Sequence, residues 1–276
     1  MYFEQAKISV ETAIFNGILT TEKLAVFAGC GIDAIELCAV KHRFDYHDQA
    51  YISGIADYIL GNKINVLSMH LPFGYDLDIS SPDSETRSSG ISAILVCAEI
   101  ANKLGTNILV LHPGVFLDQH QNRIERIDFA IKSIRELIAR TSDNLLFAVE
   151  NLPPGYLADT ARELCQIVEP VDHNRVGYCI DTGHAHLTNQ MDKLIRGCGP
   201  KILNVHIHDH AGDKDSHLMP FEGNIDWPAT VNLFNEVQFS GLLTYELTNE
   251  SAPAARIAEV MTNFTALCPK EEVMLK

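Results

Sequence analysis

Carboxylate and imidazole side chains recur in this sequence at the ends of short apolar runs. The set comprises His70, His112, Glu150, Asp181, His184, His206 and Glu246. Buried acids and imidazoles are costly unless they are paired or bind a metal, and one metal site would account for the whole set. Because the ligand atoms are oxygen and nitrogen, without thiolate, they suit Mn²⁺, Mg²⁺, Co²⁺ or Zn²⁺, and the sequence does not choose among these ions.

The histidines of "HIHDH", which begins at His206, lie at the end of one such run. Side chains two positions apart point to the same face of a strand, so His206 and His208 share a face. We expect His206 to be a metal ligand. His208 would orient a substrate hydroxyl or fill a further coordination position, and His210 would be an ordinary loop residue.

The loop that follows contains a second ligand-type pair. Asp215 and His217 form a D-x-H motif within "GDKDSH". They are metal ligands if the loop folds back over the site, and otherwise they belong to a solvated loop. Trp227, in the "GNIDW" turn, would anchor the end of this loop.

The elements that must position these residues form a repeating pattern of β-type runs and helical-period segments. The runs cover residues 7–15, 31–40, 64–73, 107–114, 145–154, 175–184, 202–209 and 242–250. The helical segments include 89–105, 126–140, 160–169, 227–237 and 251–267. Eight such repeats predict a (β/α)8 TIM barrel. The alternative, an open doubly wound sheet, would call for a glycine-rich first turn that "ETAIFNGILTTEK" does not contain.

A barrel of this kind gathers the carboxyl ends of its strands around one mouth, where active sites are built. Successive side chains of a strand point to opposite faces, so we expect Ala148 and Cys179 to face into the barrel and Val149 and Ile180 to face the helices. Glu36, within the second run, would be either a substrate contact or a member of a structural ion pair.

Composition narrows the classes of function. The 276 residues carry a net charge of −15, which argues against a nucleic-acid partner because phosphates are neutralised by Lys and Arg. We find no signal peptide and no apolar stretch long enough to span a membrane. Seven scattered cysteines fit a reduced, cytoplasmic protein. With no linker, the chain is expected to be a single domain over 1–276; the sequence leaves open whether it forms a homo-oligomer.

The motifs "VENLPPG", "DTGHAHL", "HIHDH…DSHLMPFEGNIDW" and "YEL" resemble those of the xylose-isomerase-like TIM-barrel superfamily. This superfamily includes sugar-phosphate isomerases and epimerases, ketose 3-epimerases and the endonuclease IV group. The resemblance implies a divalent metal held by Glu150, Asp181, His206 and Glu246. It also implies that Glu150 and Glu246 act as the acid/base pair. In such a site, His184 and His208 would orient substrate hydroxyls or fill further coordination positions.

Two departures bear on the activity. Ketose 3-epimerases carry an arginine shortly after the seventh strand, where this chain has Gly212 and Asp213. The nine ligands of endonuclease IV can all be matched, by the six rim residues His70, His112, Glu150, Asp181, His184 and His206 together with Asp215, His217 and Glu246, so one to three metals fit. We expect a metal-dependent sugar or sugar-phosphate isomerase or epimerase acting through an enediolate. The alternatives are a multi-metal phosphodiester hydrolase and a non-catalytic sugar-binding barrel.

Overall fold

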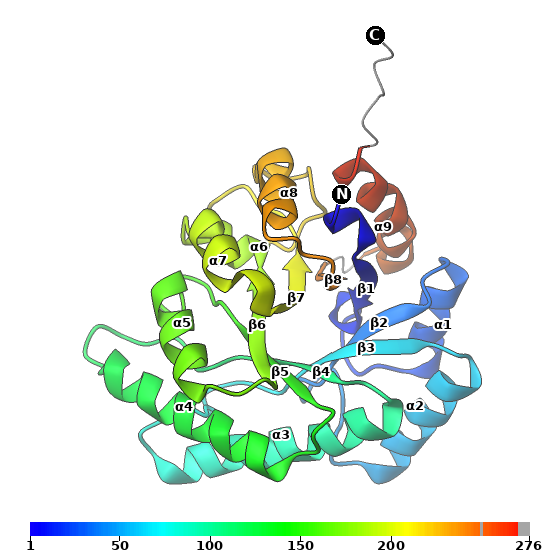
Figure 1. Cartoon of the computed structure of the whole chain (residues 1–276). Helices are drawn as coiled ribbons and strands as arrows, with labels where there is room; N and C mark the ends of the chain where they lie inside the picture. Colours follow the sequence, from blue (N-terminus) through cyan, green and yellow to red (C-terminus); the bar gives the residue numbers. More distant parts are fainter. Residues whose placement is uncertain (249–250, 270–276) are drawn as a thin grey trace.

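Parallel strands close into a barrel in the computed structural model of the chain, which describes residues 1–248 and 251–269 (Figure 1). The strands are β1 (Lys7–Glu11), β2 (Ala34–Cys38), β3 (Asn65–His70), β4 (Ile108–Leu111), β5 (Leu146–Glu150), β6 (Val176–Asp181), β7 (Ile202–Ile207) and β8 (Leu242–Tyr245). Each pairs in parallel with the next, and β1 pairs with β8. The predicted (β/α)8 barrel is confirmed, and each strand lies within the run from which it was expected.

Helices follow the strands and surround the barrel (Figure 1). They are α1 (Thr21–Gly29), α2 (Gln49–Gly61), α3 (Ser84–Leu104), α4 (Arg123–Arg140), α5 (Ala161–Val168), α6 (Thr182–Leu187), α7 (Met191–Cys198), α8 (Trp227–Glu236) and α9 (Pro253–Leu267). Short polar side chains start several of them; Asp83 Oδ2, for example, accepts a hydrogen bond from Thr86 N at 2.8 Å at the start of α3.

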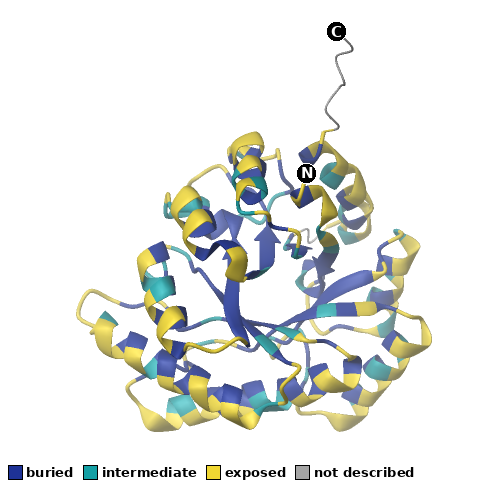
Figure 2. Cartoon of the chain, viewed as in Figure 1, coloured by how far each residue is buried: buried dark blue, intermediate teal, exposed yellow. Residues whose placement is uncertain are grey.

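The strands are buried on both faces (Figure 2). Val149 and Ile180 face outward and join the main core between the barrel and the helices. Ala148 and Cys179 face inward and form a small separate cluster with Val110 inside the barrel. The predicted period-two sorting of these residues is therefore confirmed.

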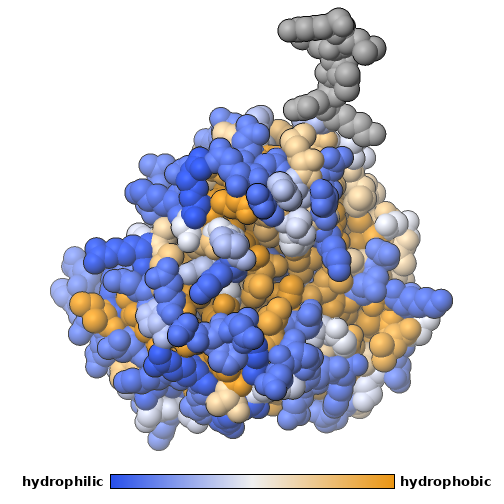
Figure 3. Space-filling view, viewed as in Figure 1, coloured by the Kyte–Doolittle hydropathy of each residue, from blue (hydrophilic) through white to orange (hydrophobic). Residues whose placement is uncertain are grey.

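The outer surface is largely polar. In the view of Figure 3, hydrophilic residues dominate the periphery and hydrophobic residues gather toward the middle. None of the helices within the described ranges combines the length and apolar character that crossing a membrane requires. Residues 249–250, which end the last predicted run, and residues 270–276 lie outside the described residues. A single domain over 1–276 stays a prediction.

Candidate metal centre

The predicted ligands meet at one end of the barrel, because the carboxyl ends of parallel strands share one mouth. His70, Glu150, Asp181 and His206 lie on β3, β5, β6 and β7, while His112 and Glu246 directly follow β4 and β8. The four strand residues are almost completely buried, with none more than 3% exposed.

The central group consists of Glu150, Asp181, His206 and Glu246, whose ligand atoms all lie within 4.8 Å of one another. His206 Nδ1 lies 2.8 Å from Glu246 Oε2 and 3.2 Å from Glu150 Oε1. The same nitrogen lies 4.0 Å from Asp181 Oδ2. Three carboxylates therefore converge on one imidazole nitrogen.

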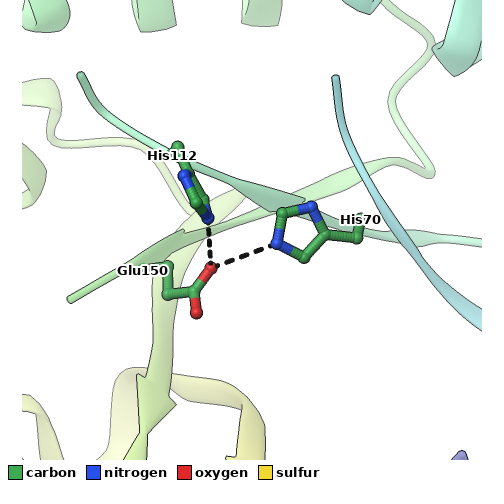
Figure 4. A group of neighbouring side chains, drawn as sticks. All are labelled: His70, His112 and Glu150. Carbon is green, nitrogen blue, oxygen red and sulfur yellow. Dashed lines mark ion pairs between the residues drawn. The ribbon is translucent and has the colours of Figure 1, made fainter. Parts of the chain in front are cut away.

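A second group shares Glu150 with the first (Figure 4). His70 Nε2 and His112 Nε2 lie 3.4 and 3.1 Å from Glu150 Oε2. Figure 4 shows both rings directed at that one oxygen. Since Oε1 of the same carboxylate faces His206, Glu150 joins the two groups.

The third group contains the D-x-H motif. Asp215 Oδ2 lies 3.2 Å from His184 Nε2 and 3.1 Å from His217 Nε2. His217 Nδ1 lies 3.1 Å from the carbonyl oxygen of Glu246, so the loop that carries the motif folds back over the mouth. All nine residues matched to endonuclease IV thus lie in three adjoining groups.

Several buried ligand atoms lack a hydrogen bond within the described part of the chain. These are both carboxylate oxygens of Glu150, both ring nitrogens of His206 and Oε2 of Glu246. Unsatisfied buried polar atoms are rare and costly in folded proteins. Their close approach, in a set made only of carboxylates and imidazoles, is the arrangement that a divalent cation would satisfy.

The pKa values of these residues are shifted by their neighbours, as is common where acids and imidazoles are buried together. Burial alone would raise the pKa of Glu150, but the imidazoles of His206 and His112 outweigh it and hold the pKa well below its usual value. Burial would lower the pKa of His184, but neighbouring acids, Asp181 foremost, raise it to about 10. The acids thus favour the protonated form of His184, and an imidazole must release that proton to bind a metal.

Helix α6 is tied to the site through Asp181. Asp181 Oδ1 accepts a hydrogen bond from His184 N at 2.6 Å, which caps α6 and places the His184 ring over the mouth. His208 Nε2 lies 3.0 Å from Asp181 Oδ2, and the His208 ring stacks on His217 with centroids 4.2 Å apart. His208 is completely buried and does not line the cavity, and it belongs to two groups of possible metal ligands, one with Asp181 and His184 and one with His217 and Glu246.

Glu36 also lies away from the substrate side. It is completely buried inside the barrel and is not among the residues lining the cavity. Its carboxylate contacts Ser68, Asn204 and His206. The structure therefore places Glu36 in a buried ion pair with His206, one of the two roles expected from the sequence.

A cavity of about 290 Å³ opens onto the ligand groups. Glu150, His184 and Glu246 line it, which leaves them accessible to a small molecule. Phe73 covers one side, with its ring stacked on His112 at a centroid distance of 3.9 Å.

A model of the xylose isomerase-like TIM barrel family matches residues 24–267. The chain belongs to this family. Among curated proteins, this family member is similar to the uncharacterized protein MJ1311 of Methanocaldococcus jannaschii, with 26% identity over 88% of this chain and 84% of that protein. A probable endonuclease 4 of Campylobacter concisus is 29% identical over 64% of this chain and 69% of its own length.

Solved structures share the fold of this family member. A D-tagatose 3-epimerase-like protein has a TM-score of 0.81 and 23% identity, covering 95% of this chain and 97% of its own. An L-ribulose 3-epimerase has a TM-score of 0.81 and 17% identity, covering 98% of each chain. The IolI protein, with a bound zinc atom, has a TM-score of 0.81 and 20% identity, covering 97% of this chain and all of its own.

Sequence reasoning missed a carboxyl group in the mouth of this xylose isomerase-like barrel. Glu11 ends β1, lines the cavity and is 2% exposed. Burial, reinforced by nearby Glu246, raises the pKa of Glu11 to about 8. The signal was present, because Glu11 lies within the first predicted run just as Glu150 lies within the fifth.

The loop after β7 was only partly predicted. Trp227 does anchor it, since Trp227 Nε1 donates a 2.8 Å hydrogen bond to Asp209 Oδ2. Asp209 also accepts hydrogen bonds from the backbone N–H groups of His210, Phe221 and Ile225. The expectation that His210 is an ordinary loop residue is wrong: it is completely buried, and its Nε2 lies 2.9 Å from the carbonyl oxygen of Gly183.

Proposed function

We propose that this chain is a divalent-metal-dependent epimerase or isomerase of a sugar or sugar phosphate. The observation that carries the proposal is the pair Glu150 and Glu246. Both line the cavity, come from different sides of the barrel and converge on His206 Nδ1 at 3.2 and 2.8 Å. The sugar epimerases that share the fold support this class of reaction.

Glu150, Asp181, His206 and Glu246 would hold the metal, which when bound supplies Lewis-acid polarisation of a substrate carbonyl. One glutamate would remove the proton from the carbon beside that carbonyl, giving an enediolate. The other would return a proton to the opposite face or to the neighbouring carbon. Burial opposes ionisation of Glu246, but His217 and His206 outweigh it and lower its pKa, so that it is an ionised base at neutral pH.

The substrate contacts are proposed from the lining of the cavity. His184 lines it and can orient a substrate hydroxyl. The position where ketose 3-epimerases carry an arginine is taken by Gly212 and Asp213, both exposed. Arg43 reaches the same cavity from the loop between β2 and α2. The proposal therefore extends to the class of epimerases and isomerases, without 3-epimerase specificity.

The test is incubation of the Mn²⁺- or Zn²⁺-loaded protein in D₂O with D-tagatose, D-fructose, L-ribulose and their phosphates, followed by ¹H NMR. We expect product formation with deuterium at the carbon beside the carbonyl. Glu246→Gln should abolish the exchange, while Glu259→Gln, a matched change at an exposed position on α9, should preserve it. Turnover without any exchange would contradict proton transfer by the glutamates.

A second candidate is phosphodiester hydrolysis, which the three adjoining ligand groups favour. The probable endonuclease 4 relative supports it. The net charge of −15 argues against a nucleic-acid substrate. Three zinc ions per chain, together with cleavage of an oligonucleotide containing an abasic site, would favour hydrolysis over the sugar reaction.

A further inference from the structure

A polar layer lies inside the barrel, one step below the metal-type ligands. It consists of the inward-facing side chains of β1, β2, β3, β7 and β8, namely Ser9, Glu36, Ser68, Asn204 and Thr244, and each is completely buried. The inward positions of β4, β5 and β6 hold the apolar cluster of Val110, Ala148 and Cys179. The polar side chains of this layer therefore lie on one side of the barrel interior, and the apolar cluster lies on the other.

Hydrogen bonds connect this layer and hold Glu36 in one orientation. Ser68 Oγ donates to Glu36 Oε2 at 2.5 Å, and Asn204 Nδ2 donates to the same oxygen at 2.9 Å. Thr244 Oγ1 donates to Asn204 Oδ1 at 3.1 Å, and Ser9 Oγ lies 2.9 Å from Thr244 Oγ1. Because Oε2 already accepts two hydrogen bonds, the other carboxylate oxygen, Oε1, can contact a different partner.

That partner is the imidazole of His206. Glu36 Oε1 lies 3.0 Å from His206 Nε2 in a buried ion pair, and neither atom forms a hydrogen bond among the described residues. The other ring nitrogen, Nδ1, faces Glu150 and Glu246. The two nitrogens of His206 thus face different carboxylate environments, one inside the barrel and one at the mouth.

We propose that Glu36 is a positioning residue that fixes the tautomer of His206. A neutral imidazole carries one proton, so an Nε2–H group that donates to Glu36 leaves the lone pair on Nδ1, directed at the central group. Carboxylates that contact metal-binding histidines orient them and increase their affinity for the ion. The inference rests on the metal site of the proposed function and not on the identity of its substrate.

Two measurements on the full chain test this role. Isothermal titration with Zn²⁺ compares the wild type with Glu36→Gln and with Glu259→Gln, a matched change at an exposed position on α9, outside this layer. We expect Glu36→Gln to weaken Zn²⁺ binding by about 10- to 100-fold and Glu259→Gln to leave it unchanged. Any sugar turnover lost by Glu36→Gln should return at excess metal, which a purely structural defect would not allow.

The second measurement needs no variant, so it decides the matter even if Glu36→Gln fails to fold. Long-range ¹H–¹⁵N NMR of the wild-type zinc form reports which nitrogen of His206 carries the proton. A proton on Nε2 and zinc on Nδ1 would support the inference. Zinc on Nε2, or unchanged Zn²⁺ affinity in folded Glu36→Gln, would overturn it. Absence of sugar turnover would instead count against the proposed function, because neither readout requires a sugar.

Discussion

At the scale of single residues, the mouth depends most on Glu150, because its two oxygens belong to different groups of ligands. Oε1 faces His206, while Oε2 faces His70 and His112. A carboxylate can serve two groups in this way, whereas an amide has one oxygen and no charge. Loss of the charge would also leave several buried imidazoles without their acceptor.

Glu150→Gln should therefore weaken metal binding by at least about 100-fold and reduce sugar turnover by about a thousandfold. Metal content after dialysis and steady-state kinetics check both expectations. Glu259→Gln is the matched control, because Glu259 is exposed on α9. Full metal content in folded Glu150→Gln would show that the central group has been assigned wrongly.

Glu11→Gln should stabilise the metal-free protein at alkaline pH. The pKa of Glu11 is raised to about 8 in the folded state, which therefore holds a proton that the unfolded state loses above the ordinary glutamate pKa of 4.5. Stability is lost as pH rises between these values. Urea denaturation with a chelator should show equal stability at pH 4 and a gain on the order of 4 kcal/mol for Glu11→Gln at pH 8. An equal gain in stability at pH 4 and at pH 8 would contradict the raised pKa of Glu11.

At the scale of elements, the third ligand group depends on how closely α6 approaches the end of β7. Gly183, in the first turn of α6, leaves no room for a side chain: a Cβ atom there would lie 1.9 Å from His208 Cε1. His208 is in turn packed against Asp181 and His217. This glycine therefore allows the helix, the strand and the folded-back loop to meet.

Gly183→Ala should displace His208, with an overpacking cost of about 1–3 kcal/mol and weaker metal binding. Gly197→Ala is the control, because a Cβ atom at Gly197, within α7, would meet nothing within 4 Å. The control should be neutral or slightly stabilising, since alanine favours helix more than glycine does. Denaturation curves and metal titration compare the two variants. Equal stability and equal metal affinity of Gly183→Ala and Gly197→Ala would refute the claim that a side chain at Gly183 displaces His208.

The elements also show what the sequence could and could not predict. Short apolar runs predicted all eight strands, because strands that are buried on both faces are apolar along most of their length. No helix was predicted at Thr182–Leu187, where the predicted run over 175–184 overlaps the start of α6, since a six-residue helix carries too little periodicity to detect. Glu36 was placed with the rim residues because depth along a strand depends on register with its neighbours. The burial of His210 depends on a contact with Gly183 that no local motif reveals.

At the scale of the whole molecule, the chain has a net charge of −15, and several of its carboxylates are concentrated at the mouth. Such a field attracts cations and repels polyanions. The buried ligands come from strands across the whole barrel, so an ion bound there would link segments that are far apart in sequence. Metal binding should therefore contribute to global stability.

Chelation should lower the melting temperature. An ion at 100 times its dissociation constant stabilises the folded state by about 2.7 kcal/mol, provided that the unfolded chain does not bind it. Thermal unfolding with Zn²⁺ and with EDTA checks this. Asp181→Asn removes one ligand of the central group, so it should reduce the difference between the melting temperatures measured with Zn²⁺ and with EDTA. A wild-type melting temperature that does not respond to metal would count against the site.

The most direct test of the metal centre is anomalous X-ray diffraction from crystals of the zinc- or manganese-loaded chain. We expect a strong anomalous peak within coordination distance of Glu150, Asp181, His206 and Glu246, with His206 binding through Nδ1. Further peaks beside His70 and His112, or beside Asp215 and His217, would extend the centre to two or three ions. An empty central group in metal-loaded crystals would contradict the claim that this mouth is a metal centre.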